Sequence, residues 1–251
     1  MWLADSGTTL LTDPVLTDRL VHLRRAAGRR PVLPGAPDAV LLSHLHADHF
    51  HLASLRMIPG SPVLVVPRGS APFVAKGLGA EAARRCVELG PGDEIEVGNV
   101  RVRAVRAAHP GNRGPWSKLQ AEAIGFVVEG AARSWYAGDT GLFDEMSDLG
   151  PLDLALIPVG GWGPTLHAHE HLDPGQAAEA LRRVKAAWSV PVHYGTFWPV
   201  GMGRVRQHMF DRPGPEFARL AAGTAPDSQV RVLRHGETLT IRPATLAGDD
   251  A

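Results

Sequence analysis

The sequence is short of cysteine, of net charge and of long apolar runs. Among its 251 residues Cys86 is the single cysteine, so no disulfide can form within the chain, and we expect its thiol to be buried and inert. Lysine and arginine number 26, as do aspartate and glutamate, so bulk charge gives no reason to expect binding to nucleic acid or to an anionic membrane, although local patches are left open. No apolar stretch approaches the length of a membrane span.

The beginning of the sequence also lacks the pattern of an export signal. MWLADSGTT has no basic region followed by an apolar one, so we predict no secretory peptide and expect a cytoplasmic protein. The composition does not shift along the chain, and the length suits one large core. We therefore predict a single domain, residues 1–251.

What the sequence does contain is a dense group of residues of metal-binding types. The stretch LLSHLHADHFHL holds His44, His46, Asp48 and His49, and the AVLLS that leads into it predicts a short buried strand. Imidazole nitrogen and carboxylate oxygen are usual ligands for zinc and similar ions. His44 and His46 alternate and can point the same way, whereas Asp48 and His49 follow the turn and can face elsewhere. The loop could therefore serve two adjacent ions; the alternative is a polar surface loop that happens to be rich in histidine.

This H-x-H-x-D-H loop resembles the signature of the metallo-β-lactamase-fold hydrolases. Four further phrases fall in that family's order and context, and they carry Asp13 in LLTDPVL, His109 in AAHP, Asp139 in WYAGDTG and His193 in VPVHYGTF. The phrases SHLHADHF, SWYAGDTG, LALIPVGG and HYGTF are most similar to the branch that contains N-acylphosphatidylethanolamine phospholipase D and the ascorbate-6-phosphate lactonase. The resemblance covers roughly Thr9 to Phe197.

The resemblance implies an α/β fold in which two sheets pack face to face with helices outside, a four-layer αββα sandwich. Strands that end in candidate ligands occur in both halves of the sequence, which favours the same layers. Residues Thr8–Leu16 predict a strand. In the family another strand precedes this one, and here WLADSG resembles only the end of that preceding strand. We therefore expect either a shortened first edge strand or a true start upstream of Met1.

The resemblance also implies a dinuclear metal centre, with two zinc ions as our first expectation and manganese or iron as alternatives. One ion would be held by His44, His46 and His109, the other by Asp48, His49 and His193, with Asp139 bridging the two. Asp13 would accept the second N–H of a ligand histidine rather than bind metal. The alternative for Asp13 is a turn aspartate bonded to its own backbone.

Two loops supply candidate substrate contacts. After His109 the segment PGNRGPWSK carries Arg113, Trp116 and Lys118, which could bind an anionic or apolar group, although a solvated loop fits the composition equally well. The segment GGWGP adds Trp162 as a further candidate.

A third loop, HAHEH, places His167, His169 and His171 in alternation. No flanking strand would hold these histidines as a separate metal site, so we interpret the segment as a mobile loop near the active site. His171 is the candidate to face substrate, because HLDPGQAAEAL resembles the family segment in which a histidine precedes the start of a helix.

Two regular elements are predicted in the last third of the chain. Asp173 begins a capping box, and apolar residues recur at helical spacing up to Trp188, so we predict a helix that packs this face on a sheet. The alternation from Val230 to Ile241 predicts a closing hairpin turned at His235-Gly236.

The predicted chemistry is hydrolysis. Two divalent ions close together lower the pKa of a shared water and stabilise an oxyanion, so no serine or cysteine nucleophile is required. We predict a phosphodiester or another phosphate-bearing small molecule or lipid as substrate, with Asp48 and His171 as catalytic candidates. A lactone or other carboxylic ester is the alternative substrate, and a non-catalytic, metal-stabilised binding protein is the alternative class. No nucleic-acid partner is expected, because the family's nucleases usually carry an inserted domain, and the oligomeric state is left open.

Overall fold

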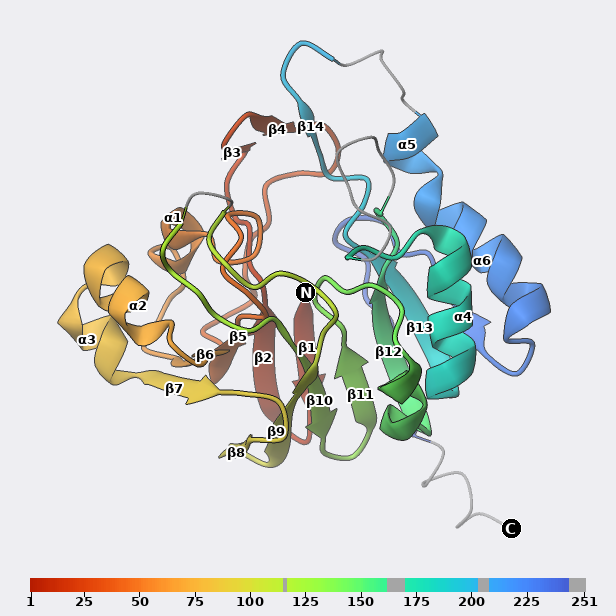
Figure 1. Cartoon of the computed structure of the whole chain (residues 1–251), viewed down its shortest axis with the longest axis horizontal. Helices are drawn as coiled ribbons and strands as arrows, with labels where there is room; N and C mark the ends of the chain where they lie inside the picture. The colour runs from red at the N-terminus through yellow and green to blue at the C-terminus, as the bar shows by residue number, and fades with distance from the viewer. Residues whose placement is uncertain (115–116, 162–169, 203–207, 244–251) are drawn as a thin grey trace.

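Two β-sheets lie face to face in the computed structural model, with helices on both outer faces (Figure 1). The structure describes residues 1–114, 117–161, 170–202 and 208–243. The first sheet has the strand order β1-β2-β5-β6-β7, with the short β1 at its edge. Its strands are β1 (Trp2–Asp5), β2 (Thr8–Thr12), β5 (Ala39–Leu41), β6 (Val63–Pro67) and β7 (Cys86–Leu89).

The second sheet has the strand order β15-β13-β12-β11-β10-β9-β8. Its strands are β8 (Glu94–Val97), β9 (Val100–Arg106), β10 (Ile124–Glu129), β11 (Arg133–Tyr136), β12 (Leu152–Pro158), β13 (Ala186–Val192) and β15 (Gln229–Val230). Strands β2 and β5 run parallel in the first sheet, as do β11, β12 and β13 in the second. Parallel neighbours release the chain at a common end of their sheet, so the loops after these strands gather at one end of the sandwich.

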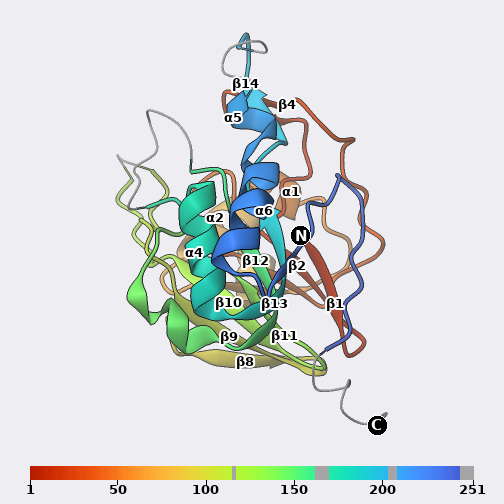
Figure 2. The ribbon, with the colours of Figure 1, turned by 90° about the vertical axis from the view of Figure 1, so that its right-hand side faces the viewer.

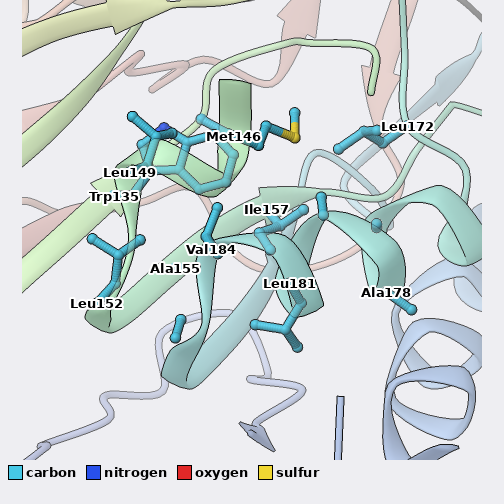
Figure 3. Packing of buried hydrophobic residues seen from close by; sticks show 14 of the residues in the cluster. Trp135, Met146, Leu149, Leu152, Ala155, Ile157, Leu172, Ala178, Leu181 and Val184 are labelled. Atoms are coloured by element: carbon cyan, nitrogen blue, oxygen red, sulfur yellow. The ribbon is translucent and has the colours of Figure 1, made fainter. Parts of the chain in front are cut away.

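Three apolar clusters hold the layers together. Between the sheets, Leu41 and Val65 of the first share one buried cluster with Phe126 and Leu156 of the second. The outer face of the first sheet packs against α1, α2 and α3, and that of the second packs against η1, α4 and α6. Figure 3 shows part of this last cluster, in which Trp135 is fully buried. The four layers confirm the predicted αββα sandwich.

The helices in these described ranges are all short, and none is long and apolar enough to cross a bilayer. They are α1 (Leu52–Leu55), α2 (Ala71–Leu78), α3 (Ala80–Arg84), η1 (Asp144–Leu149), α4 (Pro174–Val184), α5 (His208–Asp211) and α6 (Pro213–Thr224).

The capping box predicted at the start of α4 is present. The Asp173 carboxylate accepts from the Gln176 backbone N–H at 2.8 Å, and the Gln176 side chain accepts from the Asp173 N–H at 3.2 Å. The helix nevertheless ends at Val184, because Lys185 adopts a left-handed conformation with φ of 48° and the chain turns into β13. The prediction that the helix extends to Trp188 is therefore wrong. Trp188 is half-buried in β13, where pairing with β12 outweighs the apolar helical spacing.

The predicted closing hairpin is also wrong. Strand β15 covers only Gln229–Val230, beside β13. Leu233 and Leu239 pack instead against the cluster between the two sheets. In this segment the alternating apolar residues pack against the core between the sheets and do not form paired strands.

A third sheet, absent from the predictions, rises beyond one end of the sandwich (Figures 1 and 2). It has the order β14-β4-β3, and we call it the cap sheet. Its strands are β3 (Arg19–Leu20), β4 (Leu23–Arg25) and β14 (Phe197–Pro199). The hairpin β3–β4 follows β2 along the chain, and β14 follows β13, so the cap sheet joins the two halves of the sequence.

Candidate metal centre

The predicted ligands converge at one end of the sandwich. Asp13 follows β2, the loop His44–His49 follows β5, and His109 follows β9. From the second half of the chain, Asp139 follows β11 and His193 follows β13. Ligand atoms lie within 4.8 Å of one another in each of two groups: His44, His46 and His109, and Asp48, His49, Asp139 and His193. The structure thus places all the predicted ligands in two groups at this end.

Three imidazoles form the first group. Nδ1 of His46 lies 3.0 Å from Nε2 of His44 and 3.1 Å from Nε2 of His109. The other ring nitrogen of His109 donates to the backbone carbonyl of Glu170 at 2.9 Å, and that of His44 lies 3.0 Å from Oγ of Ser43. The contact with Glu170 leaves the inward nitrogen of His109 with a free lone pair, as a metal ligand requires.

Burial sets the protonation state of this first group. It lowers the pKa of His44, of His46 and of His109, to about 4 for His109. Near neutral pH the three rings are therefore neutral, which is the form that binds a metal ion.

Two carboxylates and two imidazoles form the second group. Oδ2 of Asp139 lies 3.2 Å from Nε2 of His49 and 3.4 Å from Nε2 of His193. Oδ2 of Asp48 lies 3.5 Å from the same nitrogen of His193. The Asp139 side chain is buried, whereas that of Asp48 is 40% exposed and reaches the edge of the group.

Opposite charges stabilise each other in the second group. Burial by itself would lower the pKa of His49, but the surrounding carboxylates, Asp139 first, raise it well above its usual value. Burial would likewise raise the pKa of the Asp139 carboxyl, but His193 and His49 hold it well below its usual range. A divalent ion at this position would take over the compensating positive charge that protons otherwise supply.

Two buried atoms show that the second group fits a cation. Nε2 of His49 and Oδ1 of Asp139 have no hydrogen-bond partner among the described residues. An unsatisfied buried polar atom costs about 1–3 kcal/mol. Coordination to a cation would satisfy both atoms, and this set of nitrogen and oxygen donors suits a divalent ion such as zinc.

Asp13 lies behind His49. Its carboxylate accepts from Nδ1 of His49 at 2.7 Å, from the Tyr136 hydroxyl at 2.7 Å and from the Ser43 backbone N–H at 2.8 Å. The first of these contacts orients the His49 ring so that Nε2 faces the second group. Neither Ser43 nor Tyr136 was predicted from the sequence as a site residue, although both lie in the phrases SHLHADHF and SWYAGDTG that carried the resemblance.

His171 lies against both groups. Its Nε2 is 3.6 Å from Oδ2 of Asp139, and its ring centroid is 4.7 Å from that of His109. Its Nδ1 is buried with no hydrogen-bond partner in the described part of the chain. The structure therefore brings this predicted residue to the centre, with one ring nitrogen uncommitted.

Of the predicted substrate contacts, Arg113 and Lys118 lie within the described residues, and a contact of Arg113 with substrate stays a prediction. Nη1 of Arg113 donates to the backbone carbonyls of Leu45 and Phe50 at 2.9 and 2.8 Å, so this guanidinium braces the loop His44–His49. Lys118 is exposed, and its contact with substrate stays a prediction. The remaining residues named from these loops lie outside the described ranges: Trp116, Trp162, His167 and His169.

A cavity of about 1040 Å³ reaches the second group. Asp139 and His193 line it at the metal end, Leu23 and Phe197 line it from the cap sheet, and Leu156 lines it from the second sheet. A molecule in this cavity would therefore meet the candidate ligands at one end and apolar side chains along its length.

Comparison with known proteins agrees with this geometry. A model of the β-lactamase superfamily domain matches residues 8–194. A metal-dependent hydrolase of Thermoplasma acidophilum is 31% identical over 192 residues, which cover 75% of this chain and 76% of that protein. N-acyl-phosphatidylethanolamine-hydrolyzing phospholipase D 1 of Caenorhabditis elegans is 32% identical over 218 residues, 78% of this chain and 61% of the relative.

A solved structure shares the fold. The metallo hydrolase of the archaeon Ignicoccus hospitalis superposes with a TM-score of 0.71 at 22% identity, covering 96% of this chain and 93% of that one. The family match begins at strand β2 and ends just past His193, so it spans every strand end that carries a candidate ligand. The chain therefore belongs to the metallo-β-lactamase superfamily and is a metal-dependent hydrolase.

Proposed function

We propose that this hydrolase works with two divalent ions, zinc before manganese or iron. His44, His46 and His109 would hold one ion, Asp48, His49 and His193 the other, and Asp139 would contact both. The observation that carries this proposal is the pair of unsatisfied buried atoms, Nε2 of His49 and Oδ1 of Asp139, at the centre of the second group. A polar surface loop would have left such atoms to water.

The chemistry that bound ions supply here is a water of lowered pKa and positive charge for a developing oxyanion. The protein's own residues hold and move protons. Asp48 is the more exposed of the two carboxylates and can accept a proton from the attacking water. Nε2 of His171 lies 3.6 Å from Oδ2 of Asp139, at the centre, and can donate a proton to the leaving oxygen.

The substrate that we propose is a phosphodiester that carries an apolar group. The relative in Caenorhabditis elegans is named for hydrolysis of N-acyl-phosphatidylethanolamine, which supports a phosphorus centre. The apolar wall formed by Leu23, Phe197 and Leu156 supports an apolar group beside it. The same wall also suits a lactone with an aliphatic tail, so lactone hydrolysis is the second candidate.

The test begins with metal content and turnover on one sample. We expect about two ions per chain by mass spectrometry and cleavage of bis-p-nitrophenyl phosphate in preference to a simple lactone. His171→Ala should keep the metal and lower kcat by roughly 10²–10⁴-fold, the range of a lost general acid or base. Asp139→Ala should lose metal, and His22→Ala, which changes an exposed histidine of the cap sheet, should match the wild type.

Each other outcome points to a different conclusion. Two ions with lactone cleavage alone would favour the second candidate. Metal-dependent stability without turnover of either compound would favour a non-catalytic binding protein. Unchanged rates in His171→Ala would remove the proton-transfer role of His171. A cytoplasmic location and a single domain over residues 1–251 stay predictions.

A further inference from the structure

The cap sheet ends in an apolar tip that the proposed reaction does not use. The β3–β4 hairpin turns at Val21 and His22, and the segment after β14 runs beside this turn, since the Val200 N–H donates to the His22 carbonyl at 3.2 Å. Val21 is 81% exposed, Val200 60% and Met202 40%. The Trp198 indole N–H donates to the Met202 carbonyl at 2.8 Å and anchors the second of these loops.

Two residue choices at this tip are locally unfavourable. Val21 has φ of 50°, a left-handed conformation in which a β-branched residue is an outlier. It occupies the first central position of a tight hairpin, where glycine is preferred. Arg19 and Arg24 stand directly opposite each other on β3 and β4, where like charges destabilise a sheet. In the described part of the chain neither arginine has a carboxylate partner. A partner outside the chain would account for both choices.

We propose that this tip docks the protein onto an anionic lipid bilayer. Arg19 and Arg24 each lie two residues from the turn, roughly 7 Å behind Val21 along a strand. That separation matches the roughly 5–10 Å to which apolar groups enter the boundary between headgroups and acyl chains. Val21, Val200 and Met202 would enter this boundary while the arginines remain level with anionic headgroups.

The surroundings of the tip favour a bilayer over a protein partner. A stable protein interface buries about 800 Å² on each side, whereas the exposed apolar side chains described at this tip are Val21, Val200 and Met202 alone. Trp198 lies half-buried behind them, the position that this residue type favours at a membrane surface. On its other side the cap sheet lines the cavity through Leu23 and Phe197, so docking would bring the cavity close to the lipid surface.

Sedimentation with vesicles tests the proposal without any turnover. The purified, metal-loaded full chain is mixed with large vesicles of phosphatidylcholine alone, or of equal parts phosphatidylcholine and phosphatidylglycerol. We expect binding to the second composition, weak binding to the first, and loss of binding at high salt, because the attraction depends on local charge and the net charge of the chain is zero.

Variants at the tip separate docking from folding. Val21→Gly should weaken binding several-fold while the Tm stays the same or rises, because glycine accepts the left-handed turn. Val200→Ser changes the second loop and should also weaken binding. Arg24→Gln should weaken binding about fivefold, the effect of one basic residue near an anionic surface.

Matched changes elsewhere provide the controls. Arg84→Gln removes an exposed arginine from α3, and Val232→Gly removes an exposed valine that is not part of the cap sheet. Both variants should bind vesicles as the wild type does. Equal binding of the wild type to both vesicle compositions would overturn the proposal. Unchanged binding in both Val21→Gly and Arg24→Gln would overturn it as well. Neither result depends on hydrolysis, so the proposed reaction is tested separately.

Discussion

The change Asp13→Asn should weaken metal binding although Asp13 is not among the proposed ligands. The Asp13 carboxylate accepts from four donors, which are Nδ1 of His49, the Tyr136 hydroxyl, the Ser43 hydroxyl and the Ser43 backbone N–H. An asparagine has the same shape but only one accepting oxygen, and its amide N–H₂ must face at least one of these donors. Its best orientation turns the amide toward the Ser43 backbone N–H, because the other three donors all meet the same carboxylate oxygen, Oδ2.

The magnitude follows from that orientation. One donor left unsatisfied in a buried position costs about 1–3 kcal/mol of unfolding free energy. For a chain of 251 residues each kcal/mol lowers the Tm by about 2–4 °C, so the Tm should fall by roughly 2–12 °C. Loss of the carboxylate behind a ligand histidine should weaken metal binding by roughly 10–100-fold.

Two measurements separate these effects. Competition with a coloured chelator reports metal affinity, and thermal unfolding of the metal-free protein reports stability. Tyr136→Phe is the matched control: it removes one donor to Asp13 but keeps the carboxylate on His49, so it should cost about 1 kcal/mol and leave metal affinity nearly unchanged. Wild-type metal affinity in Asp13→Asn, with a lowered Tm, would show that Asp13 only supports the fold.

Two predictions concern residues away from the centre. Burial and the neighbouring Glu88 raise the pKa of Cys86 to about 11, so less of this thiol is thiolate at pH 8 than in the unfolded chain. Its reaction with a disulfide reagent should therefore be roughly a hundredfold slower than in urea-unfolded protein, and equal rates would contradict this. Hydrogen bonds from Arg182 and Arg183 lower the pKa of Glu179 to about 2, so its stabilisation is full above the unfolded value of 4.5 and is lost as pH falls toward 2. Because the Glu179 side chain is 27% exposed and its arginine partners lie at the surface, solvent screens the pair, and Glu179→Gln should cost only about 1 kcal/mol in urea unfolding at pH 7. The cost should shrink below pH 4.5, and an equal cost at all pH values would refute the assignment.

The ends of buried strands were predictable from sequence because their signals are local. The run AVLLS before His44 and the phrase WYAGDTG around Asp139 each mark a strand and the polar loop after it within a few residues. The capping box at Asp173 is equally local. Together with the resemblance to the metallo-β-lactamase-fold hydrolases, these signals predicted the fold class and the candidate ligands.

The cap sheet was not predictable for the opposite reason. Strands β3 and β4 are short and arginine-rich, and their partner β14 comes from a distant part of the chain, so no periodicity reveals the pairing. The predictions for Trp188 and for the segment after Val230 were wrong for a related reason. Apolar spacing alone does not show whether a segment is a helix, a paired strand or an irregular stretch that packs against the core.

His49 is the point at which the two halves of the chain meet. Its Nδ1 is held by Asp13 after β2, and its Nε2 faces Asp139 after β11, so neither half of the sequence contains the centre by itself. The cap sheet repeats this arrangement, since β3 and β4 follow Asp13 along the chain while β14 follows His193. The cap sheet is therefore connected along the chain to the metal centre through the two segments that carry Asp13 and His193.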